Sequence, residues 1–253
     1  MPPLAVIFLT LCLAFCPSRA GGADLATLLR EGDRFDAQRR TAEALAVYRQ
    51  AEQLDPKQAE VLHRISKQLG ESIQDTPDTA ARRALAEQAL GYARRAVAAD
   101  PRSSNAHLSL AICLGLMTPF QPNKEKIAAS KLIESHARRA LELDPANELA
   151  HYVLGAWNHG VASLNPVLSG IARVVYGRLP SASHQQAVTH FQRAVALNPE
   201  RAASWLGLGN ALASLDRTAE ARQALQRALA LPVRYKDDET TKARAREALA
   251  ALD

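Results

Sequence analysis

The chain has 253 residues, of which 47% are apolar and 23% are charged, and its formal net charge is +5. This apolar content is enough to bury a continuous core, and the chain has abundant alanine but only 12 glycines, which favours helices. The basic residues are spread along the chain and are not gathered in a stripe interleaved with aromatic residues, so a nucleic-acid-binding protein is not indicated. No alternating pattern of useful length predicts a β-strand.

The N-terminus has the pattern of a signal peptide. Residues 4–16 form a run of 13 dominated by apolar side chains, which is shorter than the roughly 20 residues that span a bilayer. Small residues at Ser18 and Ala20 suit cleavage before Gly21. We therefore expect residues 1–20 to be a signal peptide and the mature protein to be exported, either periplasmic or envelope-associated in a bacterium. Because no Lys or Arg precedes the run, an uncleaved membrane anchor is the alternative.

A helix ending recurs along the chain. Proline cannot continue a helix and biases the residue before it away from helical geometry, so each Asp-Pro or Asn-Pro marks a turn into the next element. Successive prolines of these turns are 45, 44 and 54 residues apart. The four endings are Leu54-Asp55-Pro56, Ala99-Asp100-Pro101, Leu143-Asp144-Pro145 and Leu197-Asn198-Pro199.

The units between these endings resemble the tetratricopeptide repeat. Residues 202–233 place Trp205, Leu208, Gly209, Ala221 and Ala228 at its signature positions, and the earlier units match less completely in the same register. We predict an all-α fold, a right-handed solenoid of about five helical hairpins over residues 24–253. Residues 238–252 are expected to form a polar helix that caps the last apolar surface.

The repeats are longer than a bare unit of about 34 residues, so three of them should carry insertions. We place these between the two helices of a unit, near residues 71–78, 117–125 and 160–183. Thr76-Pro77 and Ser183-His184-Gln185-Gln186 are typical helix starts. Residues 166–176 are expected to form a short apolar helix that folds over the solenoid, and the insertions could cover the groove.

Catalytic and metal-binding patterns were sought and not found. Cys113 lies in an apolar helix and is expected to be a buried packing residue. His107 and His151 occupy the fourth position of their repeats, where a large side chain packs between helices. His184 and His190, six residues apart, do not form a ligand pair on one helix, nor do His151 and His159 at eight. The sequence predicts no enzyme, no cofactor and no metal site.

The groove of the solenoid is the predicted binding surface. In such solenoids the first helix of each pair lines the concave face, where an extended or helical peptide can bind. We expect the groove to be cationic and polar at one end and apolar in the middle, which would suit a peptide with an acidic end. The predicted partner-binding residues are His63, Arg64, Lys67, Asn105, Leu108, Ile112, Tyr152, His159, Leu206 and Asn210.

A more specific resemblance covers residue 60 to the C-terminus. The stretch Ile127–His136, the Gly155-Ala156-Trp157 step, the long insertion with Ile171-Ala172-Arg173, and Ala187–Phe191 resemble the regulator of microtubule dynamics family. The resemblance implies a non-enzymatic adaptor, and eukaryotic members of the family are associated with mitochondria, microtubules and membrane contacts. Microtubules as a partner are implied by this resemblance alone. The N-terminus and the Ala- and Arg-rich composition indicate a bacterial relative.

Two functions follow as hypotheses. The first is a protein-interaction scaffold whose groove binds a peptide segment or a partner protein. The alternative is a membrane-surface or lipid-binding module that uses the apolar insertion at 160–183 together with surface arginines. The arginine pairs in question are Arg39-Arg40, Arg82-Arg83, Arg94-Arg95 and Arg138-Arg139.

Overall fold

A computed structural model describes residues 24–164 and 182–252. Within these residues the chain forms eleven α-helices, two short 3₁₀-helices and no β-strand. The predicted helix within 166–176 lies outside the described residues. The helices are α1 (Leu25–Ala37), α2 (Thr41–Leu54), α3 (Ala59–Ser72), α4 (Thr79–Ala99), α5 (Ser104–Met117), α6 (Asn123–Leu143), α7 (Glu148–Ala162), α9 (His184–Leu197), α10 (Ala202–Ala213), α11 (Thr218–Ala230) and α12 (Asp238–Ala250), with η1 (Ile73–Asp75) and η2 (Thr118–Phe120).

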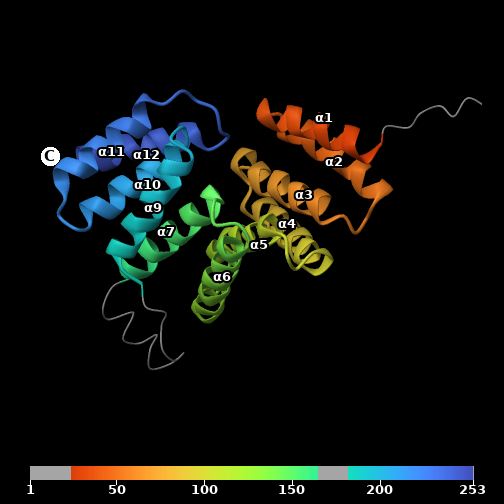
Figure 1. Cartoon of the computed structure of the whole chain (residues 1–253), viewed down its shortest axis with the longest axis horizontal. Helices are drawn as coiled ribbons and strands as arrows, with labels where there is room; N and C mark the ends of the chain where they lie inside the picture. Colours follow the sequence, from red (N-terminus) through yellow and green to blue (C-terminus); the bar gives the residue numbers. More distant parts are fainter. Residues whose placement is uncertain (1–23, 165–181, 253) are drawn as a thin grey trace, which may run out of the picture.

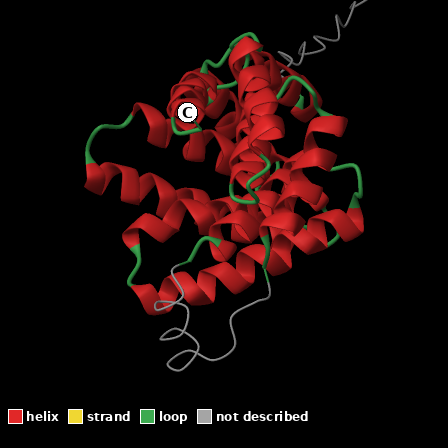
Figure 2. Cartoon of the chain, turned by 90° about the vertical axis from the view of Figure 1, so that its left-hand side faces the viewer, coloured by secondary structure: helices red, strands yellow, loops and turns green. Residues whose placement is uncertain are grey.

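The helices pair into five hairpins that follow one another along the chain. The pairs are α1/α2, α3/α4, α5/α6, α7/α9 and α10/α11, and each packs on the next. Helix α12 packs on α10 and α11 at the end of the series. Figure 1 shows the succession from α1 and α2 on one side to α11 and α12 on the other, and Figure 2 shows that every described element is helix or loop. The predicted all-α solenoid of five hairpins with a capping helix is confirmed.

The recurrent turn has a common hydrogen-bond pattern. The four helices end at the predicted Leu54, Ala99, Leu143 and Leu197. At each turn the Asp or Asn side chain accepts a hydrogen bond from the backbone N–H two residues later, at 3.1, 2.8, 2.9 and 3.2 Å in chain order. This bond closes the turn across the proline, which has no N–H of its own. The requirement for Asp or Asn before the proline therefore has a local cause.

Of the two predicted helix starts, one agrees with the structure and the other does not. Ser183 is the N-cap of α9, and its Oγ accepts from the backbone N–H of Gln186 at 3.1 Å, as predicted. The start predicted at Thr76-Pro77 is wrong by two residues. Asp78 is the N-cap of α4 and its Oδ1 accepts from Ala81 N–H at 2.7 Å, because a carboxylate at this position satisfies a free helix donor better than the threonine two residues earlier.

The first two insertions are partly longer helices. α4 and α6 have 21 residues each, whereas α2 has 14. Of the predicted segment 71–78, residues 71–72 extend α3 and residues 73–75 form η1. Of 117–125, Met117 ends α5 and α6 already begins at Asn123. The extra residues therefore lengthen the second helices on the outer side of the solenoid as well as the loops.

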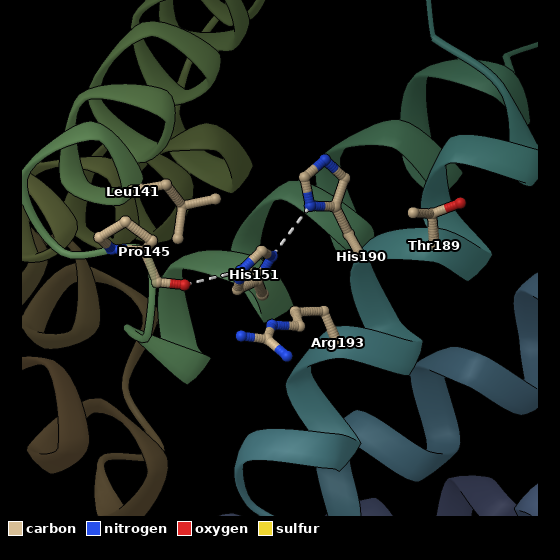
Figure 3. Close-up of a pocket in the computed structure, with 6 residues that line it drawn as sticks. All are labelled: Leu141, Pro145, His151, Thr189, His190 and Arg193. Carbon is tan, nitrogen blue, oxygen red and sulfur yellow. Dashed lines mark hydrogen bonds between the residues drawn. The ribbon is translucent and has the colours of Figure 1, made fainter.

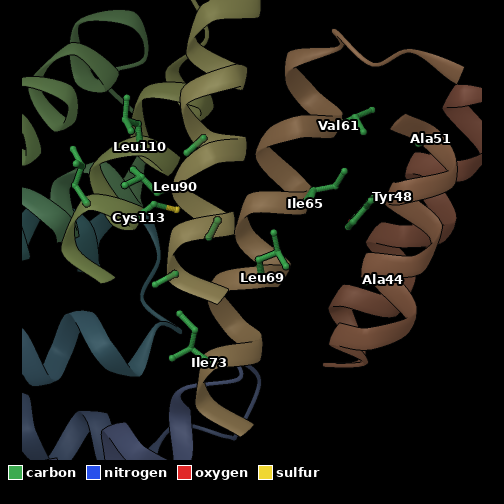
Figure 4. Close-up of a cluster of buried hydrophobic side chains, with 14 of the residues drawn as sticks. Ala44, Tyr48, Ala51, Val61, Ile65, Leu69, Ile73, Leu90, Leu110 and Cys113 are labelled. Atoms are coloured by element: carbon green, nitrogen blue, oxygen red, sulfur yellow. The ribbon is translucent and has the colours of Figure 1, made fainter. Parts of the chain in front are cut away.

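Small residues let the two helices of a hairpin cross closely. A Cβ atom placed on Gly32 would lie 2.2 Å from the ring of Tyr48, and one on Gly209 would lie 2.7 Å from Leu225. Both partner side chains are completely buried. Figure 4 shows Tyr48 on α2 directed toward the face of α3 that carries Ile65 and Leu69, within the largest core cluster, which extends from α1 to α5. Glycine is therefore required for space at these crossings.

Replacing Gly32 with alanine is expected to lower the free energy of unfolding by roughly 1–3 kcal/mol, because the new methyl group overlaps a buried ring. The matched control is Gly91→Ala on the exposed side of α4, where a Cβ meets nothing within 4 Å. Helix propensity predicts that this control raises stability by about 1 kcal/mol. Urea denaturation of both variants measures the difference, and equal effects of the two substitutions would contradict the role assigned to Gly32.

Candidate partner-binding surface

Helix α5 leaves one narrow stripe open. Most of its residues are buried on all sides by α3, α4, α6 and α7. Asn105 and Ile112, seven residues apart and so on the same face, are its two exposed residues, and Ile112 is 36% exposed. A Cβ on Gly115, near Ile112, would meet nothing within 4 Å. The first helix of the third hairpin thus presents an exposed apolar side chain with free space beside it.

Helix α7 continues this open stripe. Ala156 and Gly160, four residues apart on one face, are exposed, and a Cβ on Gly160 would meet nothing within 4 Å among the described residues. α5 and α7 contact each other as first helices of consecutive hairpins. Both first helices therefore carry exposed residues on one face. The apolar middle section expected for the groove stays a prediction.

The N-terminal end of the inner face is not cationic, and this corrects the prediction. Arg64 donates to both carboxylate oxygens of Asp33, at 2.7 and 3.0 Å, and also pairs with Glu60. Lys67 pairs with Asp36 and with Glu71, the latter at 3.6 Å. Two cationic side chains therefore meet four carboxylates. The sequence pattern missed this because Asp33 and Asp36 belong to α1, 31 residues before their partners.

Two of the four carboxylates, Glu60 and Asp33, have lowered pKa values and stay ionised. A hydrogen bond from His63, together with Arg64, lowers the pKa of Glu60 to about 2 against the opposing effect of burial. Burial also opposes ionisation of Asp33, but hydrogen bonds from Arg64 and Tyr48 outweigh it and lower the pKa of Asp33. The side chains of Asp33 and Glu60 remain 47% and 41% exposed. Negative charge is thus accessible at this end of the surface.

Several predicted groove residues belong to the packing between helices. Leu108 is buried against Ala140 and Ala150, and Leu206 packs on the cluster formed by α11 and α12. Tyr152 is half-buried, with its ring centroid 5.9 Å from that of Phe191, and burial raises the pKa of its hydroxyl. These large side chains pack against other helices, within their own hairpins or on the next element, so they contribute less open surface than expected. Asn210 is half-buried on α10.

The connector between α11 and α12 reaches back to the second hairpin. Lys236 of this connector pairs with Asp75 of η1, 161 residues earlier in the chain. Next to it, Asp237 accepts from Arg201 at 3.1 Å, and the Arg201 guanidinium stacks 4.3 Å above the ring of Tyr235. The tyrosine hydroxyl in turn accepts from Asn198 at 3.1 Å. Residues 231–237 therefore tie the last hairpin to the corner between α3 and α4 and limit the length of the open surface.

Histidines form pairs between the two helices of a hairpin. His107 on α5 and His136 on α6 place their Nδ1 atoms 2.9 Å apart, and His151 on α7 and His190 on α9 place theirs 3.2 Å apart. The third pair is His159 and His184, also on α7 and α9, at 3.2 Å. His159, predicted to face the groove, is thus engaged inside its own hairpin.

The side chain at the fourth position of the repeat forms a hydrogen bond to the turn before its helix. The Nε2 atoms of His107 and His151 lie 3.0 and 3.3 Å from the carbonyl oxygens of Pro101 and Pro145. Trp205 donates from Nε1 to the carbonyl oxygen of Pro199 at 2.9 Å. A ring N–H at this position therefore holds α5, α7 and α10 each to the turn that precedes it. The predicted structural role of His107 and His151 is confirmed.

Histidine spacing within a single helix does not reveal these cross-helix pairs, and they were not predicted. A signal was available in the repeat register. His136 and His190 each stand nine residues before the turn proline, and His107 and His151 each stand six residues after one. Aligning the repeats on their prolines would have brought the four residues together in two equivalent pairs.

Potential metal ligands do not gather in the described ranges 24–164 and 182–252. These ranges contain no group of three or more His, Cys, Asp or Glu side chains arranged to hold a metal ion. Cys113 is buried, with its Sγ 3.1 Å from Ser66 Oγ, and burial raises the pKa of its thiol to about 11, so the prediction of a packing residue is confirmed. Among the helices of these ranges, none is long and apolar enough to cross a membrane.

The fold and its inner surface define a protein of the tetratricopeptide-repeat class. A crystal structure of a thermophilic TPR protein from Thermus thermophilus superposes with a TM-score of 0.62 at 17% identity, covering 89% of this chain and 99% of that one. A chain of the APC/C hetero-tetramer Cut9–Hcn1 superposes with a TM-score of 0.61, at 17% identity, over 90% of this chain and 36% of that one. These likenesses establish the fold.

The chain belongs to the family described as regulator of microtubule dynamics protein 1-3, whose model matches residues 28–253. Regulator of microtubule dynamics protein 1 of Mus musculus is 28% identical over 172 residues, which are 68% of this chain and 56% of that protein. The Bos taurus protein is 32% identical over 115 residues, 46% of this chain and 36% of that one. The matched part thus spans about half or less of these relatives.

Acidification is expected to weaken the fold through the histidine pairs. Burial, together with His107, lowers the pKa of His136 below its ordinary value of 6.5. The unfolded chain therefore binds more protons than the folded chain just below pH 6.5, and the free energy of unfolding falls as the pH drops through that window. Above pH 6.5 the full stability is present.

His136→Gln should reduce this loss, because glutamine can still donate to His107 but does not titrate. Urea denaturation at pH 7.5 and pH 5.0 measures the difference. The variant should lose less stability than the wild-type chain between the two pH values. Part of the loss should remain in both proteins, because His151, His159 and His190 also have lowered pKa values. An equal pH dependence in both proteins would disprove the contribution of this pair.

Proposed function

We propose that this protein is a non-enzymatic interaction scaffold whose inner surface binds a segment of a partner protein. The observation that carries the proposal is the stripe on α5 and α7, where Ile112 is exposed beside small residues that leave space in front of them. Ile112 offers an apolar contact, and the small residues near it leave room close to the helix backbone. Such a surface can accept an apolar side chain of a bound peptide. Membership of a family of regulators, and a fold built of repeats, are consistent with such a role.

The charge of the neighbouring end favours a basic partner. Arg64 and Lys67 are already paired, while Asp33 and Glu60 keep about half of their side chains exposed. A Lys or Arg of the partner would meet carboxylates that stay ionised at neutral pH. This reverses the acidic peptide end expected from the first helices alone. We infer a partner segment that carries an apolar residue to contact Ile112 and a basic residue to pair with the carboxylates on α1 and α3.

Ile112→Asp is expected to abolish capture of the partner, because it places a charge where an apolar anchor binds. Leu132→Asp is the matched control, since Leu132 is an exposed leucine on the second helix α6, 48% exposed. Affinity capture from the native compartment, read by mass spectrometry, compares the wild-type chain with both variants. A protein lost only with Ile112→Asp supports the surface, and loss with both variants or with neither would sink the proposal.

The predicted export remains part of this proposal. It rests on residues 1–20, which lie outside the described residues, and places the scaffold in the bacterial periplasm or envelope. The uncleaved anchor is the competing arrangement. The intact mass of the protein isolated from its own cells separates the two, since cleavage before Gly21 removes the first 20 residues.

The membrane-surface alternative stays a prediction. Its apolar element, 166–176, is outside the described residues. In every arginine pair assigned to it, at least one guanidinium already pairs with a carboxylate, as Arg83 does with Glu87 and Arg95 with Glu52. Flotation with anionic liposomes tests this alternative directly. Co-flotation of the Ile112→Asp variant with such vesicles would favour the membrane over the peptide groove.

A further inference from the structure

A hollow lies between the second helices α6 and α9, away from the inner surface. Its volume is about 400 Å³. Figure 3 shows His151 of α7 between the α6 side and His190 of α9, with the guanidinium of Arg193 directed toward it. None of the lining residues is acidic. They are Leu141, Pro145, His151, Thr189, His190 and Arg193.

The hydrogen bonds fix how the two imidazoles share their protons. Nε2 of His151 lies 3.3 Å from the carbonyl oxygen of Pro145, which can only accept, so this nitrogen carries a hydrogen. Nδ1 of the neutral ring is then an acceptor, and Nδ1 of His190 donates to it across 3.2 Å. The Nε2 atom of His190 is left to take up a proton without loss of that bond. The pair can therefore become singly positive and keep its geometry.

An arginine recurs at one position of the repeat. Arg95, Arg139 and Arg193 each stand six residues before the turn proline of their unit. Arg95 pairs with Glu52 at 2.7 Å, and Arg139 pairs with Glu142 at 2.8 Å. A carboxylate thus satisfies the equivalent guanidinium in the second and third hairpins.

Arg193 differs from its two equivalents. Among residues 24–164 and 182–252 no carboxylate pairs with it, and Ala196 occupies the position at which Arg139 finds Glu142. The segment 165–181, which precedes α9, contains no Asp or Glu in its sequence. The same guanidinium also borders the hollow and adds positive potential at His151. An acidic partner is missing where the repeat elsewhere supplies one.

We propose that this hollow binds a carboxylate of another protein molecule, an Asp or Glu side chain or a chain end, with Arg193 as its ion-pair partner and the His151–His190 pair beside it. The site is distinct from the inner surface, because four of its lining residues lie on the second helices α6 and α9. His151 belongs to the first helix α7 but lies nine residues before Gly160 and so on the opposite side of that helix. The scaffold then holds partners on two faces. Carboxylate binding here does not depend on the peptide groove.

Binding is coupled to proton uptake. Burial, then His151 and Arg138 of α6, lower the pKa of His190 to about 4. Burial and Arg193 lower the pKa of His151, against the hydrogen bond to Pro145. A bound carboxylate offsets the repulsion from these guanidinium groups and so raises the pKa of His190. By linkage, carboxylate affinity increases as the pH falls from neutral toward 5.

Sodium acetate is the probe, and NMR of the ¹⁵N-labelled chain is the measurement. Titration at pH 7.5 and pH 5.5, against sodium chloride at equal ionic strength, follows the imidazole signals of His190 and the Nε signal of Arg193. We expect saturable shifts with acetate that are absent with chloride, and a several-fold tighter apparent Kd at pH 5.5. Equal responses to acetate and chloride mean an adventitious ion only and overturn the proposal.

Two variants and one further anion complete the test. Arg193→Gln should abolish the acetate response, while Arg139→Gln, at the equivalent position but paired with Glu142, should keep it. His190→Gln should bind acetate with little pH dependence. Undiminished binding in Arg193→Gln, or saturation by inorganic phosphate without any acetate response, overturns the carboxylate assignment.

Discussion

The close crossing of the two helices within each hairpin is the constraint on which this structure depends. At Gly32, Gly155 and Gly209 a single added methyl group would enter a buried side chain of the second helix. These distances fix how closely the two helices of a hairpin approach, because interiors are packed too densely to absorb an extra carbon. The same limit acts between consecutive hairpins at Gly207 of α10, whose Cβ would lie 2.3 Å from Phe191 of α9. The stacking aligns the first helices, and this alignment leaves the stripe that contains Ile112 open.

The turns use a second local device to hold each first helix in place. An Asp or Asn closes the turn across the proline, and a ring N–H six residues later bonds to the proline carbonyl at three of the four turns. His107 and His151 perform at this position what Trp205 performs in the last hairpin. Their second ring nitrogen is then free to meet a histidine of the second helix. The histidine that holds the first helix to its turn is thereby also one member of a titratable histidine pair.

Repetition also makes exceptions informative. The arginine before the turn is neutralised in the second and third hairpins and has no carboxylate partner in the described part of the fourth. The inner surface shows the opposite case. Arg64 and Lys67 of α3 have the sequence of free cations, but they pair with Asp33 and Asp36 of α1. Arg64, paired with Asp33 of α1, and Arg95, paired with Glu52 of α2, show that the charge of a site can depend on a residue of another helix. The sequence of one helix alone is then not enough to predict that charge.

The sequence by itself determined the helices, their endings, the repeat and the close crossings, because propensity, proline turns and small-residue spacing act within about 40 residues of chain. It also identified Ile112 and Asn105 on the open stripe, since their helix position fixes the face they occupy. Only the tertiary structure decided the rest. Leu108 is buried against α6 and α7, and Leu206 packs on α11 and α12. Arg64 meets Asp33, Lys236 reaches Asp75, and histidines pair across helices. Side-chain length, rotamer and the angle between helices determine which of these distant groups meet.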